Sequence, residues 1–420
     1  MKMIILLLFV TLCSSELIAQ PKRINLNWCY EQSEANYPMV KQRNLIASTA
    51  AYTLENARKG LLPQVNIYGQ ATYQSAVTGL PLKLPGNEME PISKDQYKLY
   101  GEITQTVYDG GAVAGQRRLT EARMKKEHAE IRSELYQLRK SVNQIYFSIL
   151  LVDNRLEVID LRRRDLQTAL ELSEGAVMNG TALPSHTDQI RVELLVLDQS
   201  ALEQKILKDS YLSMLTQYTG QAITPADTLE IPSEARFIPE EITRLELDVI
   251  DAQRNVIGLQ SSLLLVKSRP KFNLFIQGGY GRPALNFLSN NFELYGIGGL
   301  RMIWPLSARY TLKGEKSIYE NNLSSLEVQR ELFLFHTKMG LIKERAEIEK
   351  WHQLLTSDVR IIELRNRIKT VAAQQLKEGT ILPADFIREV NAEALARENL
   401  SFHKIQYLLY GYNLKASLGQ

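Results

Sequence analysis

The sequence contains a stretch of 59 residues, Gln116–Glu174, without a single glycine or proline. Apolar residues recur inside it at alternating steps of four and three positions, which is the heptad pattern of helices packed side by side. One helix over this stretch is about 90 Å long, because each residue adds about 1.5 Å. A globular core does not need a helix of that length. The apolar positions are Ile131, Leu135, Leu138, Val142, Ile145, Ile149, Val152, Leu156 and Ile159.

The second half of the sequence contains a similar stretch. No proline occurs between Leu306 and Leu382, and apolar residues repeat there every seven positions. Arg345 and His352 occupy the alternate heptad positions, so the apolar seam of this helix is less regular. The repeating residues are Leu341, Ile348, Leu355 and Ile362. Shorter helices are expected at about 27–59, 185–219, 240–266 and 384–410.

One phrase connects the long helix to the next helix in both halves. Gly-Thr-x-Leu-Pro occupies 180–184 and again 379–383. Glycine ends a helix well because it adopts the left-handed conformation, and proline suits the first turn of the next helix because its missing donor is not needed there. Each copy therefore predicts a tight turn, 179–184 or 378–383, at the tip of a helical hairpin. We assign to the tips Gly180, Thr181, Leu183, Pro184, Gly379, Thr380, Leu382 and Pro383.

Four segments alternate between apolar and polar residues with a period of two, which predicts β-strands. Their length is slightly above the 9–11 residues of a tilted transmembrane strand. Aromatic residues mark their ends, as in the interfacial girdle of membrane barrels. An ordinary sheet resting on a soluble core is the alternative. The segments are 64–75, 97–108, 271–282 and 292–304. The aromatic residues are Tyr73, Tyr97, Tyr108, Phe272, Tyr280, Phe292 and Trp304.

The two halves share one order of elements: helix, two strands, long helix, tip and helix. This order predicts an internal repeat, with a first copy at 20–220 and a second at 240–420. The linker between them, 221–239, contains three prolines.

The N-terminus has the features of a secretory signal peptide, 1–19, with cleavage expected after Ala19. Cys13 would suit lipidation, but Leu12 stands before it where a small residue is expected. Cleavage leaves one cysteine, Cys29, and hence no internal disulfide. The 50 basic and 47 acidic residues nearly balance, which argues against a nucleic-acid partner.

Four strands cannot close a barrel, because even the smallest membrane barrels have about eight. An open sheet edge in lipid leaves backbone donors and acceptors unpaired. The sequence therefore predicts a mainly α-helical protein with membrane β-structure, in which several copies close one barrel in contact with outer-membrane lipid. The long helices would continue this barrel as a coiled-coil tube in the periplasm, with the tips at its far end.

Several short stretches, in matching order and spacing over the mature chain, resemble the TolC family of outer-membrane efflux proteins. The resemblance implies a homotrimer with a twelve-stranded barrel and a periplasmic tunnel of twelve helices. It also implies docking to a periplasmic adaptor protein and, through it, to an inner-membrane pump, with drugs, metals or secreted polypeptides as cargo. The stretches are Glu34–Pro38, Ala57–Pro63, Val107–Gly111, and Tyr407 with Asn413–Gly419.

The resemblance also implies that polar and charged contacts at the second tip hold the duct closed. Gly379-Thr380 and Asp385 match the family pattern, whereas Ile381 replaces its arginine, and Arg388 stands where a second acidic residue is common. Asp385 and Arg388 are therefore candidates for a different closing contact. Asp188 at the first tip is a third gate candidate, which either lines the rim or caps its helix.

Two other classes of function were weighed. An enzyme has little support, because none of the five histidines falls in a His-Glu-x-x-His pattern or beside a cysteine pair, so no catalytic, metal or cofactor site is expected. A soluble periplasmic coiled-coil adaptor or scaffold would account for the heptads, the tips and the export signal. It would not account for four alternating segments with aromatic ends.

Overall fold

The computed structural model describes residues 22–77, 92–234 and 241–419. The predicted signal peptide, with Cys13, lies outside the described residues, as does part of the predicted linker. The chain packs into two compact units, which we call the tip unit and the sheet unit. The tip unit comprises Met1–Tyr37, Leu135–Ile242 and Met339–Gln420, and the sheet unit comprises Pro38–Glu134 and Thr243–Lys338. Each unit takes segments from both halves of the sequence, so the predicted repeats are not the packing units, and their bounds stay a prediction.

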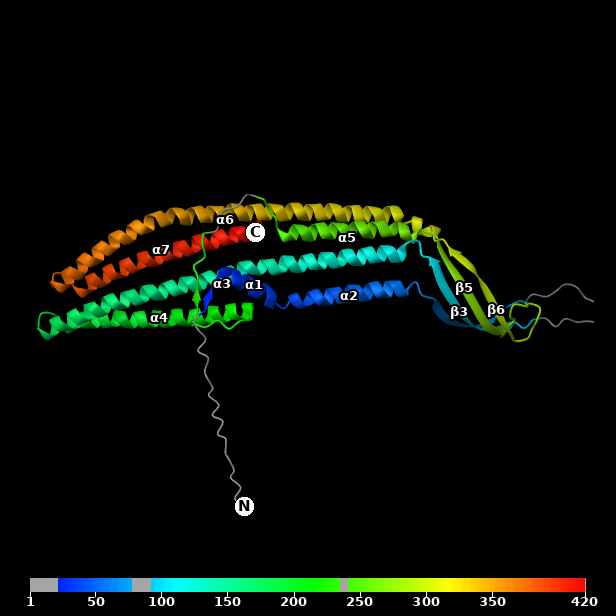
Figure 1. Cartoon of the computed structure of the whole chain (residues 1–420), viewed down its shortest axis with the longest axis horizontal. Coiled ribbons are helices and arrows are strands. Elements are labelled where there is room, and N and C mark those ends of the chain that lie inside the picture. Colours follow the sequence, from blue (N-terminus) through cyan, green and yellow to red (C-terminus); the bar gives the residue numbers. More distant parts are fainter. Residues whose placement is uncertain (1–21, 78–91, 235–240, 420) are drawn as a thin grey trace, which may run out of the picture. The chain divides into compact units, whose positions relative to one another are not determined.

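Long helices make up most of the described chain (Figure 1). The two longest, α3 and α6, have 67 and 66 residues. The helices are α1 Leu26–Asn36, α2 Val40–Lys59, α3 Ala112–Met178, α4 Pro184–Thr219, α5 Leu245–Lys267, α6 Leu312–Lys377 and α7 Pro383–Leu418, with a short 3-10 helix at Leu306–Arg309. The strands are β1 Arg23–Ile24, β2 Gln64–Tyr73, β3 Asp95–Tyr108, β4 Thr228–Leu229, β5 Lys271–Arg282 and β6 Glu293–Ile303.

The first predicted helix is interrupted. In place of one helix over 27–59, α1 ends at Asn36 and α2 begins at Val40. Pro38 explains the break, because a proline ring disfavours the helical conformation of the residue before it. Tyr37 accordingly has an extended backbone, with φ −60° and ψ 129°. The boundary between the two units falls at the same place.

The four predicted strands form one antiparallel sheet in the order β2–β3–β5–β6. The halves of the sequence meet along β3 and β5, which pair from Tyr97 with Arg282 to Tyr108 with Phe272. β2 and β6 are the edges, and within the described residues neither pairs with a further strand.

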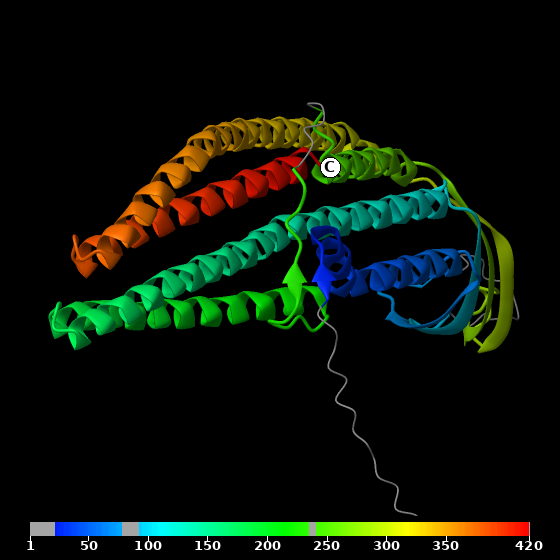
Figure 2. The same cartoon turned by 60° about the vertical axis from the view of Figure 1, so that its left-hand side comes forward.

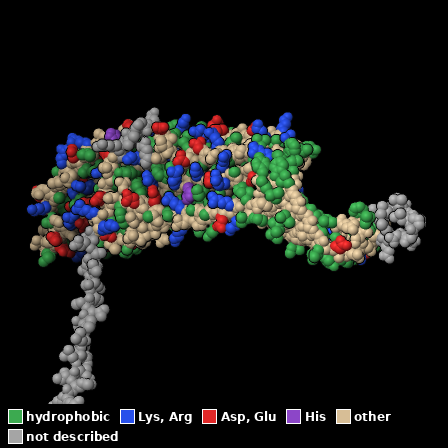
Figure 3. Space-filling view, turned by 45° about the vertical axis from the view of Figure 1, so that its right-hand side comes forward, with side chains coloured by type: hydrophobic (Ala, Val, Ile, Leu, Met, Phe, Trp, Pro, Cys, Tyr) green, Lys and Arg blue, Asp and Glu red, His purple; other side chains and the backbone are tan. Residues whose placement is uncertain are grey.

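One face of this sheet is apolar and exposed. Ile67 and Leu294, for example, are 79% and 84% exposed. A sheet resting on a soluble core would bury such a face, so the alternative of an ordinary sheet is not supported. Charged side chains gather over the helices and are few on the sheet in the view of Figure 3. The exposed apolar residues of this face include Val65, Ile67, Leu99, Ile103, Leu274, Ile276, Leu294, Leu300 and Met302.

On the opposite face, a buried carboxylate connects three strands. Arg301 of β6 donates two hydrogen bonds to Glu102 of β3, at 3.0 and 3.2 Å. Gln277 of β5 donates a third, and the hydroxyl of Thr104 donates a fourth at 2.9 Å. The Arg301 guanidinium also lies over the ring of Phe275, 4.3 Å from its centre. These side-chain bonds add to the backbone ladder and hold the two halves of the sheet together.

In the tip unit, the two predicted hairpins share one hydrophobic core. The turn from α3 to α4 and the turn from α6 to α7 lie at the same end of this unit (Figure 2). The hairpins are therefore packed against each other along their sides. The core residues are Ile159, Leu166 and Ala169 of α3, Ile190, Leu197 and Ala201 of α4, Ala372 of α6, and Phe386 and Val390 of α7.

A second core of the tip unit surrounds Tyr146. Its hydroxyl lies 2.8 Å from the carbonyl oxygen of Ile24 and 2.7 Å from that of Glu230, and its one proton is shared between these two acceptors, which attaches the segments around β1 and β4 to α3. Cys29 lies in the same core. Burial raises the pKa of this thiol to about 12, so it stays protonated and unreactive at neutral pH.

Replacing Arg301 by leucine is expected to lower the free energy of unfolding by about 1–3 kcal/mol, because the buried Glu102 carboxylate loses its cationic donor. The double variant Glu102→Gln, Arg301→Leu should recover part of this loss, because it removes the charge that needs a partner. Unfolding of the purified protein in detergent, followed by the circular dichroism of the sheet, gives both values. A single variant as stable as the wild type would contradict a stabilising role of the pair.

Candidate functional site

The first tip is a turn closed by backbone hydrogen bonds. α3 ends at Met178, and Gly180 follows with φ 71°. The N–H of Gly180 donates to the carbonyl of Val177 at 3.0 Å, and the N–H of Thr181 donates to that of Ala176 at 2.9 Å. This is the Schellman pattern of a glycine-ended helix. The Thr181 hydroxyl donates to the same Ala176 oxygen at 2.9 Å, which explains why a threonine follows the glycine.

The second tip repeats this geometry. Gly379 has φ 71°, and its N–H donates to the carbonyl of Leu376 at 3.0 Å. The N–H and the hydroxyl of Thr380 donate to the Gln375 carbonyl at 2.9 and 3.0 Å. The same two residue types thus close the helix in both copies by the same hydrogen bonds.

The Leu-Pro end of the phrase starts the next helix. Pro184 and Pro383 are the first residues of α4 and α7, and Leu183 and Leu382 before them are extended. Neither leucine caps its helix by a side-chain bond. Their side chains are 64% and 55% exposed. Each tip therefore presents an apolar side chain that does not pack into the core of its own unit.

The predicted gate residues form ion pairs within their own helices. Asp188 pairs with Arg191 of α4 at 3.4 Å, and Asp385 pairs with Arg388 of α7 at 3.3 Å. The interpretation of Asp188 as a helix cap is wrong, because Leu183 holds the N-cap position and Asp188 lies inside α4. Neither pair joins the two hairpins, so a closing role for these residues stays a prediction.

Charged residues that the sequence analysis did not select do join the two hairpins. The ammonium of Lys369 in α6 lies 2.7 Å from the carboxylate of Asp165 in α3 and 3.5 Å from that of Glu393 in α7. Glu393 is only 1% exposed, and Arg397 donates a further bond to it. Lys369 therefore holds one carboxylate from each hairpin.

A second cluster of polar residues, close in sequence to the first, also joins the two hairpins. Arg162 of α3 donates to Glu193 of α4 at 3.2 Å and also to Asn391 of α7. Asn391 in turn donates to Glu193 at 3.1 Å. We call the two clusters together the polar layer. Its six residues are Arg162, Asp165, Glu193, Lys369, Asn391 and Glu393.

The sequence carries one signal for this layer. Glu393 follows Phe386 and Val390 at steps of four and three, so a carboxylate falls on the apolar seam of α7. A charge at such a position is expected to be paired, because burying it alone is costly. The seam alone could not indicate that the partner comes from α6.

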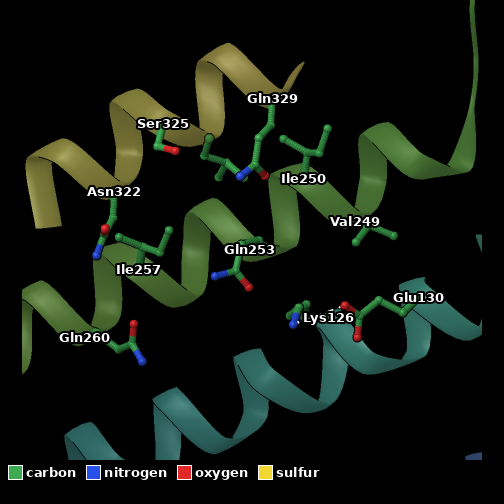
Figure 4. A pocket seen from close by; sticks show the side chains of 11 residues that line it. Lys126, Glu130, Val249, Ile250, Gln253, Ile257, Gln260, Asn322, Ser325 and Gln329 are labelled. Carbon is green, nitrogen blue, oxygen red and sulfur yellow. Dashed lines mark ion pairs between the residues drawn. The ribbon is translucent and has the colours of Figure 1, made fainter. Parts of the chain in front are cut away.

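The sheet unit contains a pocket of about 490 Å³ between α3, α5 and α6. Side-chain amides and one ion pair, Lys126 with Glu130 at 3.1 Å, line it (Figure 4). The pocket presents amide, hydroxyl and charged groups that can bind polar solutes. Its amides come from Gln253, Gln260, Asn322 and Gln329.

In 22–77, 92–234 and 241–419, no three His, Cys, Asp or Glu side chains gather as metal ligands. Over the same ranges, no helix combines the length and the apolar run needed to span a membrane.

Comparison with known proteins gives a family and a fold. Residues 29–220 match the model of the family described as outer membrane efflux protein. No protein with curated annotation matches the sequence.

Solved structures match nearly the whole chain, with 94% of it covered in each of three cases. VceC, an outer membrane protein of Vibrio cholerae, has 13% identity and a TM-score of 0.64, with 94% of its own chain covered. The CmeC outer membrane channel of Campylobacter jejuni has 14% identity and a TM-score of 0.66, with 85% covered. The open state of the MtrE outer membrane channel of Neisseria gonorrhoeae has 12% identity and a TM-score of 0.66, with 88% covered.

Long helical hairpins and an antiparallel sheet with an exposed apolar face are the fold that this chain shares with these outer-membrane channels. Residues 29–220, just under half of the chain, match the outer membrane efflux protein family, as the resemblance to the TolC family led us to expect. The chain is an exit duct of the outer membrane, which confirms the predicted function and location, and the mainly helical fold with a β-domain is confirmed as well. The trimeric twelve-stranded barrel stays a prediction. The match is to a family of channels rather than to a class of enzymes.

Replacing Gly180 or Gly379 by alanine is expected to loosen the affected tip by about 1–2 kcal/mol, the cost of a left-handed residue with a side chain. An added Cβ meets nothing within 4 Å at either position, so the effect comes from the backbone alone. Hydrogen exchange of the tip amides measures the loosening.

Gly175→Ala is the matched control. Gly175 also has open space around it, but it lies inside α3 and has no positive φ. Alanine there should slow exchange, because it favours the helix by up to about 1 kcal/mol. Equal exchange in all three variants would contradict the role of the glycines.

Proposed function

We propose that three copies of this chain form one duct, in which twelve strands close a single barrel and twelve helices form the periplasmic tunnel. The observation that carries the proposal is the open sheet β2–β3–β5–β6, whose edges are unpaired within the described residues. Its exposed apolar face suits lipid, and lipid does not satisfy unpaired backbone groups. Pairing of β2 with β6 of the next copy removes every edge. The count of three comes from the family resemblance.

We further propose that the tips dock a periplasmic adaptor protein, which connects the duct to an inner-membrane pump. The exposed Leu183 and Leu382 support this role, since an apolar side chain at the end of a long helical hairpin gains free energy by covering itself with a partner. Met178, beside the first tip, is 87% exposed and extends the apolar surface. Residues 180–181 and 379–380 hold the turns that present these side chains.

The polar layer is our proposal for the contact that keeps the two hairpins of each chain together in the closed duct. Opening requires one hairpin to move against the other, and this movement separates Lys369 from Asp165. Asp188, Asp385 and Arg388 remain candidates for contacts between copies at the rim. We assign transport and no catalytic role to these residues.

The detergent-extracted protein is expected to have the mass of three chains and to resist extraction from membranes by salt. Mass measurement of the purified particle tests this expectation. A salt-extractable monomer or dimer would instead favour the soluble adaptor or scaffold.

Lys369→Met is expected to increase the open fraction of single channels in a lipid bilayer. Loss of the cation leaves Asp165 without its partner from α6, which costs the closed arrangement about 1–3 kcal/mol. Such a cost shifts an equilibrium between two states by about 5- to 150-fold.

Arg360→Met provides the control, since Arg360 pairs with Glu363 of the same helix at 2.8 Å. It removes a cation from α6 without touching the other hairpin, and the open fraction should stay that of the wild type. Equal open fractions for the Lys369 variant and the wild type would refute the polar layer as the closing contact. An increase for Asp385→Ala, Arg388→Ala alone would place that contact at the rim.

A further inference from the structure

Three tyrosines lie in one row across the polar face of the sheet. The strand register pairs Tyr68 of β2 with Tyr100 of β3, Tyr100 with Gly279 of β5, and Gly279 with Tyr295 of β6. Tyr100 is two residues from Glu102 on the same strand, so the row shares the face of that carboxylate. The apolar, exposed residues described above all belong to the opposite face.

The glycine in this row lets the aromatic side chains approach one another. A Cβ atom at Gly279 would lie 2.5 Å from the Cβ of Tyr100 and 2.9 Å from the Cζ of Tyr295. The ring of Tyr295 therefore lies over the glycine, toward Tyr100. On the other side of Tyr100, the rings of Tyr68 and Tyr100 are stacked, with centroids 5.1 Å apart and an angle of 25° between the planes. The row therefore consists of a stacked pair on β2 and β3 and a third tyrosine of β6 that leans toward it over Gly279.

The polar face does not cover this surface. Tyr68 is 42% exposed, and Tyr100 and Tyr295 are partly exposed. Polar residues border the row on both sides along β3, namely Lys98 and Glu102. The charge of Glu102 is already balanced by Arg301. The tyrosine rings are therefore the surface that a solute can contact without breaking an existing pair.

We propose that this tyrosine row binds planar aromatic compounds inside the barrel. The proposal rests on the proposed function, since only a closed barrel with its apolar face in lipid turns the polar face toward a lumen. In that barrel, the three copies of the row lie at one level. Tyrosine offers a π-face for stacking and a hydroxyl for a hydrogen bond. Stacking accepts many different flat rings because each has a π-face, so the row selects a class of cargo rather than one molecule.

The test is binding of ethidium, a planar aromatic cation, to the purified protein in detergent, measured by fluorescence anisotropy. Tyr100→Leu keeps an apolar side chain but removes the ring, and the dissociation constant should rise about tenfold, within the range found when one stacking contact is lost. Tyr68→Leu, on the edge strand, should act in the same direction and provides a second variant. Tyr100→Phe keeps the ring and should stay within about twofold of the wild type.

Two controls separate ring contact from other causes. Tyr73→Leu makes the same chemical change on β2 but on the apolar face, where Tyr73 is 78% exposed, and it should leave binding unchanged. Excess tetraethylammonium, which has the same charge without a ring, should not displace ethidium.

Wild-type binding by both Tyr100→Leu and Tyr68→Leu would overturn the proposal, as would displacement by tetraethylammonium. Weak binding by Tyr100→Phe would also overturn it, because the ring face would then not be the contact. Particle mass is measured on the same samples. A particle that is not a trimer refutes the proposed duct, whereas a trimer whose tyrosine variants bind like the wild type refutes only the tyrosine row.

Discussion

Backbone hydrogen bonding at the edges of one sheet is the constraint on which the rest of the molecule depends. In lipid, the N–H and C=O groups of β2 and β6 that point away from the sheet need partners that the described chain does not supply. In the proposed duct, closure by further copies satisfies these groups. It also arranges the helices, because α2 and α5 lead directly into β2 and β5, and α3 and α6 follow β3 and β6. In that duct, each strand pair is followed along the chain by a long helix, so closure of the sheet also sets the number of helices in the proposed tunnel.

In the tip unit, apolar and polar contacts contribute differently to holding the two hairpins together. The core around Leu166, Ile190 and Val390 holds the four helices together through apolar burial, which depends little on exact position. The polar layer does depend on position, since Lys369 reaches Asp165 only in one register. A buried ion pair adds little net stability, but separating its partners is costly. Such a pair suits a contact that has to be either fully made or fully broken.

Local rules predicted the long helices, the four strands and the tip turns, because heptads, alternation and the Gly-Thr-x-Leu-Pro phrase act over a few residues. Pro38 was also visible, but its effect on the first helix was not predicted. The polar layer escaped prediction because Asp165 and Lys369 are 204 positions apart, and only tertiary packing brings them together. The tyrosine row depends on strand register, which fixes Gly279 between Tyr100 and Tyr295 and cannot be read from any one strand.

The two faces of a membrane sheet have different physical requirements. The residues of the inner face therefore say more about function than those of the outer face. The outer face must be apolar, so Ile67 or Leu294 indicates only that lipid is near. The inner face needs only polar side chains that water can solvate. A buried charge or an aromatic ring on this face therefore needs a separate explanation. Glu102 has a structural cause, because it joins three strands. The tyrosines join nothing comparable, although a glycine makes room for their rings. Tyr68 and Tyr100 stack across β2 and β3, which stabilises the sheet, and the three tyrosines also remain partly exposed, which the proposed contact with cargo requires.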